Sequence, residues 1–486
     1  MTSIDKYIEN EGAILSGQLA AYIVKTHKIG ETAARKRIER LKSPIHKLTG
    51  LFSEKQSLIY HSDHYNSEIY FQKLKEAFEV AAKRCFAVLT AINYHHGVIA
   101  KKDLANYTFS PLSNIRGHLK YSTLIEKLIK VGVLIDYDET HYQLNGHLAE
   151  STEPNFRHYK GIQFSKDLLI NQFGNWSRNI GLNSFKKGQQ NSDVAGFQFA
   201  FTAPSYISGL VQYKNNALKP GFVVVDVLIG NSTRLQEIDF FIQKVNAIKA
   251  SNPTLKLFPI LIVDGVDTTA LNKLKQTGVL IATIRELFGE SYNELLKNLI
   301  NTITNAGTIL KKDPESYINL MMQLTKLVEG KTNNLRGDLF ELAVGYYYGQ
   351  QCQYLEVGKK VRIENDIKTR EVDVLAIYEK EVRIVECKGY NYPVDDTYTL
   401  KYLNEKIPAL RKWLEKSFPQ KKNTFEIWST GGFTQEAADL LEKAKVNTKK
   451  YNVDYLNKED ILERAKQLQT SKFTDILKEY YFKEIV

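Results

Sequence analysis

The chain has 486 residues, too many for one ordinary hydrophobic core, and this length predicts about three domains. It contains no run of about 18 apolar residues and no basic, apolar leader, so we expect neither a membrane-spanning helix nor a signal peptide. Its three cysteines lie far apart without a CxxC pair, which argues against a disulfide framework or structural zinc and predicts a cytoplasmic location. The net charge of +11 favours a polyanionic partner, since Lys- and Arg-rich surfaces attract phosphates.

Polar, turn-rich stretches predict loops between domains at three places: 61–67, 145–160 and 305–316. These loops divide the chain into four predicted domains: 1–64, 65–150, 151–305 and 315–486. The sequence has no GxxxxGK[ST] motif, so we expect no ATP-driven translocase within the chain.

The first two segments have the same predicted order of elements, in which helices are followed by a hairpin. In the first, a helix over 15–27 precedes one that begins with Thr32 as its N-cap, and a short hairpin follows Gly50. In the second, a long helix over 71–95 and two shorter helices precede a hairpin around Thr140. This order resembles two winged helices in tandem, each a variant of the helix-turn-helix.

The predicted helix after Gly30 and the segment that follows it are strongly basic. Residues 35–47 contain one acidic residue, Glu39, and these basic residues: Arg35, Lys36, Arg37, Arg40, Lys42 and Lys47. We expect Arg35, Lys36, Arg37, Arg40 and Lys42 to contact DNA. The second segment offers fewer: Arg116, His118, Lys120, Lys127 and Lys130. The alternatives are a solvated helix face and a winged helix that binds protein.

The segment after residue 330 predicts an amphipathic helix and three strands. Apolar residues at 335, 339, 342, 343 and 346 mark the helix, and Glu341 is its first acid beyond the N-terminal turn. The strands are predicted at 355–364, 370–378 and 382–390, and the last two form a hairpin.

Glu386 and Lys388 lie two residues apart on the last of these strands, so their side chains point from the same face. Asp373 precedes an apolar run on the neighbouring strand, which can set it beside Glu386. Two carboxylates and the backbone carbonyl of Cys387 form an all-oxygen site suited to Mg²⁺ or Mn²⁺. Such an ion polarises a phosphodiester, and Lys388 would orient water and stabilise the developing charge. Glu341 would complete the acid cluster or hold a second metal.

These motifs, RGxxFE, EVDVLA and VECKGY, resemble the PD-(D/E)XK or restriction-endonuclease-like nucleases over about 330–460. They are most similar to the Mrr-like and Holliday-junction-resolvase-like branches. The resemblance implies a central mixed sheet flanked by helices and these catalytic residues: Glu341, Asp373, Glu386 and Lys388. It implies metal ligands at Asp373, Glu386, the Cys387 carbonyl and Glu341, and we add Arg336 as a DNA contact. Val372 replaces the proline of the superfamily's name, which leaves the catalytic set intact.

Residues 151–305 repeat the order of elements predicted for the C-terminal domain. In this comparison Asp226 takes the position of Glu386, and Leu228 takes that of Lys388. We interpret the segment as a degenerate nuclease-like α/β domain, because leucine cannot replace the lysine. It would grip DNA, form a dimer or position the cutting domain. The alternative is an unrelated α/β domain with the same layers.

The sequence therefore predicts a multidomain α/β protein that acts as a Mg²⁺-dependent DNA endonuclease, and the resemblance suggests restriction or anti-phage defence. Duplex DNA is the expected partner, with possible defence-system partner proteins and no membrane. One active site cuts one strand, so cleavage of both strands predicts a homodimer. Two alternatives stay open: a nuclease for branched DNA or RNA, and a DNA-binding regulator in which the nuclease fold is a scaffold.

Overall fold

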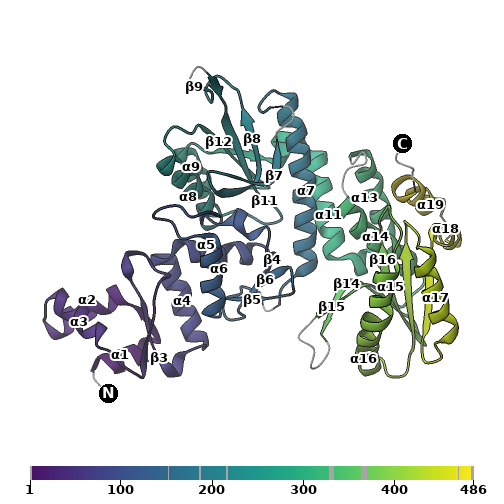
Figure 1. Ribbon diagram of the computed structural model, residues 1–486, viewed down its shortest axis with the longest axis horizontal. Coiled ribbons are helices and arrows are strands. Elements are labelled where there is room, and N and C mark those ends of the chain that lie inside the picture. Colours follow the sequence, from purple (N-terminus) through teal and green to yellow (C-terminus); the bar gives the residue numbers. More distant parts are fainter. Residues whose placement is uncertain are drawn as a thin grey trace. The chain divides into compact units, whose positions relative to one another are not determined.

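The computed structural model describes residues 3–151, 153–184, 188–214, 217–327, 333–362, 369–468 and 470–482 (Figure 1). The chain is a multidomain α/β protein with two compact units, Met1–Asn293 and Glu294–Val486. Within the described ranges, no helix has both the length and the apolar composition needed to cross a membrane.

The first unit begins with two small segments of helices and strands. Each segment contains one antiparallel sheet, and the two sheets have the same topology. The first comprises α1 (Ser3–Glu11), β1 (Ala13–Leu15), α2 (Ser16–His27), α3 (Glu31–Glu39), β2 (Ile45–Leu48) and β3 (Leu58–His61), with strand order β1-β3-β2. The second comprises α4 (Glu68–Ala81), α5 (Lys83–Tyr94), β4 (Val98–Ala100), η3 (Leu104–Tyr107), α6 (Tyr121–Lys130), β5 (Leu134–Asp136) and β6 (His141–Leu144), with strand order β4-β6-β5. In each sheet the last strand in sequence lies in the centre.

Several details of this region differ from the prediction. Strands β1 and β4 lie between helices, which the predicted order of helices followed by a hairpin does not include, and β2 lies before Gly50, not after it. Helix α3 begins at Glu31 with Gly30 as its N-cap, so Thr32 is not the capping residue. The long helix expected over 71–95 is broken at Ala82, whose backbone is not helical (φ −141°, ψ 58°). The break lets α4 pack on β1 and β3 while α5 packs on η3 and on α8 (Leu235–Ser251).

A five-stranded sheet follows in the same unit, with strand order β13-β12-β11-β8-β7. Its strands are β7 (Gln189–Val194), β8 (Phe197–Ser205), β11 (Gly221–Leu228), β12 (Leu257–Val263) and β13 (Leu280–Thr283), and β9 (Gln212–Lys214) and β10 (Ala217–Lys219) form a separate hairpin. The accompanying helices are α7 (Phe156–Asn179), α8 (Leu235–Ser251), α9 (Thr268–Thr277) and α10 (Ile284–Phe288). Strand β11 is almost wholly apolar and buried, which is typical of a strand covered on both faces.

The second unit contains another five-stranded sheet, with strand order β14-β15-β16-β17-β18. Its strands are β14 (Tyr354–Arg362), β15 (Thr369–Ile377), β16 (Glu381–Lys388), β17 (Lys422–Ser429) and β18 (Asn452–Leu456). Its helices are α12 (Ala306–Lys312), α13 (Pro314–Leu327), α14 (Asn333–Gly349), α15 (Asp396–Lys401), the π-helical turn η4 (Tyr402–Lys406), α16 (Ile407–Ser417), α17 (Gln435–Asn447), α18 (Lys458–Lys466), α19 (Ser471–Ile476) and the turn η5 (Leu477–Tyr481). Helix α11 (Glu290–Thr304) spans the boundary between the units. The predicted end of the first strand, at 363–364, lies outside the described residues.

The two five-stranded sheets have the same strand order and directions. In the second unit, β14, β15 and β16 are antiparallel neighbours, and β16, β17 and β18 are parallel. In the first unit, β7, β8 and β11 are antiparallel neighbours, and β11, β12 and β13 are parallel. In both, a helix connects the central strand to the next parallel strand. The same path of the chain is therefore built twice.

Helices cover both faces of the second sheet (Figure 1). On one face, apolar side chains of β15, β16 and β17 pack against Tyr402, Ile407 and Leu410. On the other, buried Glu426 accepts hydrogen bonds from the Tyr348 hydroxyl of α14 and from Arg464 of α18. These contacts hold α14 and α18 against this face of the sheet.

The stretch 305–316 is helical, which corrects the loop predicted there. Gly307 of α12 lies against the Leu355 carbonyl so closely that a Cβ would not fit, and Lys311 donates to the Gly349 carbonyl at 3.1 Å. This packing joins α12 to β14 and α14, and the boundary between the compact units lies at 293/294.

Candidate active site

The register of β15 and β16 brings two carboxylates together. The antiparallel ladder ends at the pair Val374–Val385, and Asp373 and Glu386 are the next residues on the two strands. The backbone N–H of Cys387 donates to Asp373 Oδ2 at 2.8 Å, which fixes the aspartate at this junction. Only 7% of Asp373 and 2% of Glu386 are exposed. Both side chains therefore continue the buried face of the sheet beyond its apolar core.

Glu386 is surrounded by cations and a phenol. Lys388 Nζ lies 2.8 Å from Glu386 Oε1, and Lys406 of η4 forms an ion pair with Glu386 Oε2. The Tyr398 hydroxyl, from α15, donates to Glu386 Oε1. Lys388 Nζ also lies 4.5 Å from the centroid of the Tyr398 ring. The crossover helix thus supplies two partners of the strand carboxylate.

The surroundings of the two carboxylates shift their pKa values in opposite directions. Burial alone would raise the pKa of Glu386, but the charges of Lys406 and Lys388 outweigh it and lower that pKa to about 2. Burial, followed by the negative charge of Glu386, raises the pKa of Asp373 to about 6. Glu386 is therefore ionised at neutral pH. Burial and the charge of Glu386 instead favour the protonated form of Asp373.

Glu341 lies on α14 at the margin of this cluster. Its Oε2 is close to Gly358 of β14, as is Oε1 of Glu371. Its charge also adds to burial and to Asp373 in raising the pKa of the buried Cys387 thiol. Within the described residues, no group of three or more His, Cys, Asp or Glu side chains is arranged to hold a metal ion. The carboxylates brought together at the ladder end are those of Asp373 and Glu386.

Arg336 of α14 forms hydrogen bonds with two other segments of the chain. Its Nε donates to the Gly389 carbonyl at 3.1 Å, and Nη2 donates to the Tyr481 carbonyl. The guanidinium also lies 5.6 Å from the centroid of the Tyr481 ring. Two of its donor groups are therefore occupied by the chain, and its expected contact with DNA stays a prediction.

Lys406 and Tyr398 are partners of the site that the sequence interpretation did not select. In the sequence, Lys406 is one of five basic residues between 401 and 416, the others being Lys401, Arg411, Lys412 and Lys416. A signal was present, because Lys406 follows buried Tyr402 by four residues and precedes buried Leu410 by four. A lysine inside an apolar helical stripe needs a buried acid as its partner, and here that acid is Glu386.

The first unit contains a related acid–lysine pair on its corresponding strand. Asp226 Oδ2 lies 2.6 Å from Lys244 Nζ of α8, and both side chains are buried. The ladder between β8 and β11 ends at Phe201–Val225, so Ala200 stands opposite Asp226 where Asp373 stands opposite Glu386. Leu228 occupies the position of Lys388. The pair from strand and helix is present, but the second carboxylate and the strand lysine are absent from these positions.

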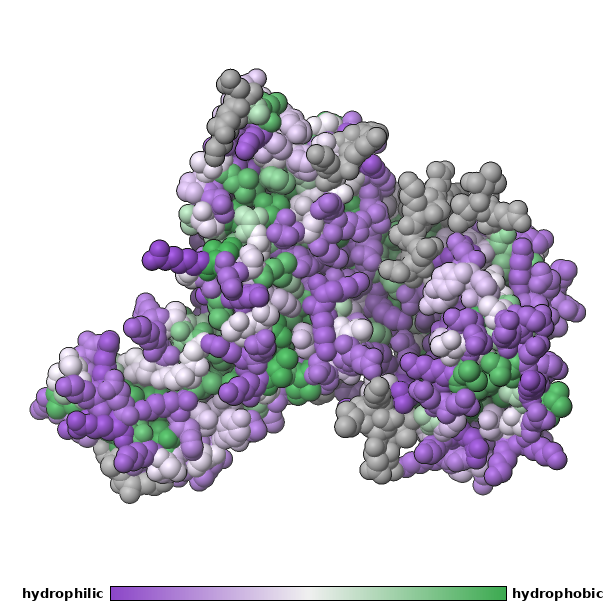
Figure 2. All heavy atoms as spheres, viewed as in Figure 1, coloured by the Kyte–Doolittle hydropathy of each residue, from purple (hydrophilic) through white to green (hydrophobic). Residues whose placement is uncertain are grey.

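The basic residues of α3 are gathered on an exposed surface. Arg35, Lys36, Arg37, Arg40 and Lys42 are all exposed, whereas Ala34 and Ile38 face the core. Arg35 forms an exposed ion pair with Glu31 at 2.6 Å. Hydrophilic residues also dominate the region of α2 and α3 in Figure 2. In the second segment, by contrast, Lys127 donates to the Gly50 carbonyl at 2.6 Å and is less available to a ligand.

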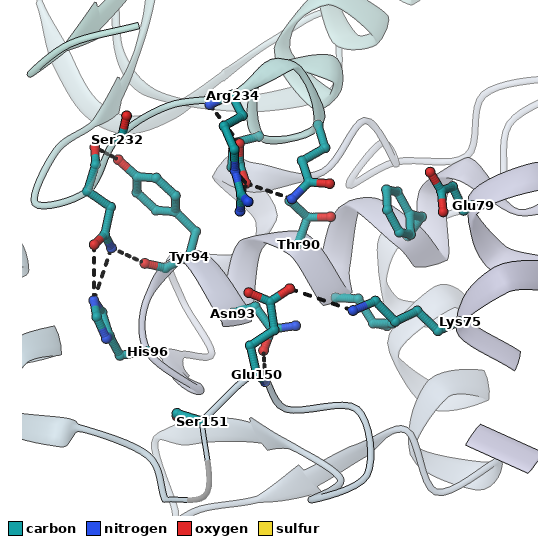
Figure 3. Close-up of a pocket in the computed structure, with 15 residues that line it drawn as sticks. Lys75, Glu79, Thr90, Asn93, Tyr94, His96, Glu150, Ser151, Ser232 and Arg234 are labelled. Atoms are coloured by element: carbon teal, nitrogen blue, oxygen red, sulfur yellow. Dashed lines mark hydrogen bonds and ion pairs between the residues drawn. The ribbon is translucent and has the colours of Figure 1, made fainter. Parts of the chain in front are cut away.

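A cavity of about 530 Å³ lies in the first unit, at the carboxyl end of β11 and the start of α8 (Figure 3). Its polar groups are largely paired with one another: Arg234 donates to Glu237 at 2.9 Å, and Lys75 lies 3.6 Å from Glu150. Asp226 and Lys244 are not among the residues that line it. The buried acid–lysine pair therefore does not form part of the wall of this cavity.

Comparisons with known proteins do not assign the chain to a family. No protein-family model matches it, and no curated protein matches it. Among solved structures it is similar to protein VC1899 from Vibrio cholerae, with 8% identity and a TM-score of 0.16, over 46% of this chain and 50% of that one. The chain thus spans about half the length of that protein. These comparisons therefore carry no argument about the function of the chain.

Proposed function

We propose that this chain is a metal-dependent DNA endonuclease whose active site comprises Asp373, Glu386 and Lys388, with Glu341 at its margin. The observation that carries the proposal is the register of β15 and β16, which sets Asp373 beside Glu386. Lys388 follows on the same strand and contacts Glu386 at 2.8 Å. Two adjacent carboxylates that can hold a metal ion and a lysine beside them are groups that support metal-dependent phosphodiester hydrolysis.

The residues present fit a divalent cation. Asp373, Glu386 and the Cys387 carbonyl supply oxygen donors, which Mg²⁺ and Mn²⁺ prefer. The pKa of Asp373 is raised by burial and by the charge of Glu386, so a cation between these carboxylates would relieve their repulsion. When bound, such an ion would polarise the phosphodiester and make its water more acidic.

Each side chain has a separate role in this proposal. Lys388 would donate to a phosphoryl oxygen and hold the attacking water near the phosphorus. Lys406 contacts no substrate in this scheme and positions Glu386 through their ion pair. Glu341, near Gly358, would supply a further oxygen to the cluster.

We assign DNA as the polymer because of the first unit. The helices and strands of its two small segments succeed one another along the chain in the order found in winged helices. Helix α3 also presents exposed arginines and lysines. We interpret the first five-stranded sheet as a degenerate copy of the nuclease sheet that supports the protein without cutting. A homodimer would be needed to cut both strands, and a role in restriction or anti-phage defence is proposed from the sequence resemblance.

Cleavage of plasmid DNA in the presence of Mg²⁺ tests this proposal. We expect Glu386→Gln and Lys388→Ala to lower the cleavage rate by about 100-fold or more, because the first removes a charged metal ligand and the second removes the cation that acts on the reacting phosphate. Lys412→Ala removes an exposed lysine from the nearby helix α16 and serves as the matched control. Chelation of the metal should stop cleavage by the unchanged chain. Wild-type rates in the Glu386 or Lys388 variant, with folding verified by circular dichroism, would show that the site is assigned wrongly.

A further inference from the structure

Two tyrosines form an exposed stack just beyond the candidate catalytic lysine. Tyr390 and Tyr392 lie in the loop after β16, with ring centroids 5.0 Å apart and ring planes inclined by 5°. Tyr390 is 36% exposed and Tyr392 is 62% exposed. Large aromatic rings are usually buried or bound to a partner, because their exposed faces lose the hydrophobic contribution of burial. This stack leaves flat apolar surface open to solvent beside a charged site.

The loop that carries the stack is held in place by its neighbours. The Thr430 hydroxyl donates to the Tyr390 carbonyl at 2.8 Å, and the Thr430 backbone N–H donates to the Lys388 carbonyl at 2.9 Å. Gly431 lies so close to the backbone of Tyr392 that no Cβ would fit. On the other side of the loop, a Cβ at Gly389 would lie 2.8 Å from the Cβ of Phe340. Since the backbone is already ordered, little further entropy is lost when a ligand binds the rings.

We propose that Tyr390 and Tyr392 bind unpaired bases of a DNA strand next to the phosphate that is cut. Tyr390 is two residues beyond Lys388, so their Cα atoms lie within about 7 Å of each other. Stacked nucleotides are spaced by about 3.4 Å along a strand, so the rings are only a few nucleotides from the lysine. This inference rests on the proposed nuclease function and names the class of its substrate.

The chemistry of the rings selects single-stranded segments. In a continuous duplex each base is stacked on its neighbours, and its faces are not available to a protein ring. In an unpaired segment the faces are free, and aromatic side chains bind them with little regard to sequence. We therefore assign the site to DNA with unpaired nucleotides at the cut, such as a flap, a branched junction or an opened end.

Binding by the full-length Glu386→Gln protein tests the inference without cleavage. The probe is a single-stranded oligonucleotide that contains 2-aminopurine, whose fluorescence falls when the base stacks. We expect quenching on binding, and we expect the Tyr390→Ala/Tyr392→Ala pair in the same background to weaken binding by about tenfold or more. Affinity for a fully paired duplex of the same sequence should change by less than about twofold.

The matched control is Tyr390→Phe/Tyr392→Phe, which keeps both rings and removes only the hydroxyls. It should bind and quench the probe like the parent protein. Tyr392→Ala alone, at the more exposed position, provides a second variant should the double substitution disturb the fold. The inference fails if the alanine variants bind the single strand as tightly as the parent, or if the phenylalanine pair loses as much affinity. Plasmid cleavage by the unchanged chain would still support the nuclease proposal in that event.

Discussion

Glu386 receives one lysine from its own strand and another from the crossover helix. Lys388 reaches Oε1 at 2.8 Å, and Lys406 pairs with Oε2. Two partly buried ammonium groups and one buried carboxylate leave an excess positive charge, which is costly in a poorly solvated place. Asp373 can balance that charge only when it is ionised. The four side chains therefore depend on one another, and the charge state of Asp373 is the adjustable part.

The role of Lys406 can be tested by Lys406→Met, which keeps much of the side-chain length and removes the charge. Lys406 lowers the pKa of both Asp373 and Glu386, so its loss should raise both values. As the pH falls, the carboxylates of the variant should take up protons at a higher pH than those of the wild type. In the wild type, protonation of Asp373 should determine the position of the acidic limb of the pH–rate profile. We expect this limb, measured at fixed Mg²⁺, to shift to higher pH in the variant.

Lys412→Met on the exposed face of α16 provides the control for Lys406→Met and should leave the profile unchanged. If Lys406→Met lowers the rate equally at every pH, Lys406 contributes only to packing. If it changes neither the rate nor the profile, the ion pair with Glu386 has no part in the reaction.

Contacts between residues of one strand or helix could be predicted from the sequence, because they follow the periodicity of that element. Contacts between residues far apart in the sequence could not. Strand alternation alone put Glu386 and Lys388 on one face, and their contact has that geometry. Arg336 looked like a free cation in its motif, but two of its donor groups bind the carbonyls of Gly389 and of Tyr481, which lies near the far end of the chain. No local pattern announces a partner 145 residues away.

At the scale of elements, the strands and helices of the second sheet could be predicted because alternation and turn residues agree there. Strand β7 (Gln189–Val194) could not, because it is polar and largely exposed at the edge of its sheet. Its existence depends on hydrogen bonds to β8, which a single segment does not reveal.

Glycine and proline misled the prediction at 305–316, where they serve helices instead of a loop. Pro314 is the first residue of α13, a position where its missing N–H costs no hydrogen bond. Gly307 of α12 permits close approach to the backbone of β14. Both residues look like loop signals in a sequence, and only the packing of the neighbouring elements distinguishes the two uses.

Helix α3 provides a prediction at this scale. Arg37→Ala with Arg40→Ala should weaken binding to duplex DNA and should reduce the dependence of log affinity on log salt by about two, since each phosphate contact contributes about 0.9. Fluorescence anisotropy over a salt series, with the cleavage-deficient Glu386→Gln protein, measures both quantities. The expected cause is loss of two exposed cations from one helix face.

Lys6→Ala with Lys25→Ala removes the same total charge from the exposed surfaces of α1 and α2 and is the matched control. It should reduce affinity less and leave the salt dependence nearly unchanged. Equal effects from both pairs of substitutions would mean that net charge, and not α3, determines binding.

For the whole molecule, the repeated sheet separates structure from chemistry. Both sheets place an acid on the central strand and a lysine on the following helix: Asp226 with Lys244, and Glu386 with Lys406. In the first unit the lysine also donates to two backbone carbonyls, at 2.6 and 2.7 Å, so its hydrogen-bonding capacity is filled by the protein. The acid–lysine pair therefore fastens a crossover helix to its sheet. The chemistry proposed for the second unit depends on the groups added there, Asp373 and Lys388.

This distinction predicts opposite outcomes for equivalent substitutions. Asp226→Asn leaves the charge of Lys244 buried without its counter-ion, which should destabilise the first unit by about 3–5 kcal/mol. The midpoint of urea unfolding should fall, while DNA cleavage below the transition stays near the wild-type rate. Asp226→Leu combined with Lys244→Met leaves no buried charge and should recover part of the lost stability, the remainder being lost because the Asn106 and Gln198 carbonyls no longer have the lysine as donor. Loss of cleavage in Asp226→Asn protein that is still folded would instead make the first sheet part of the catalytic machinery, and the interpretation of the duplication would have to change.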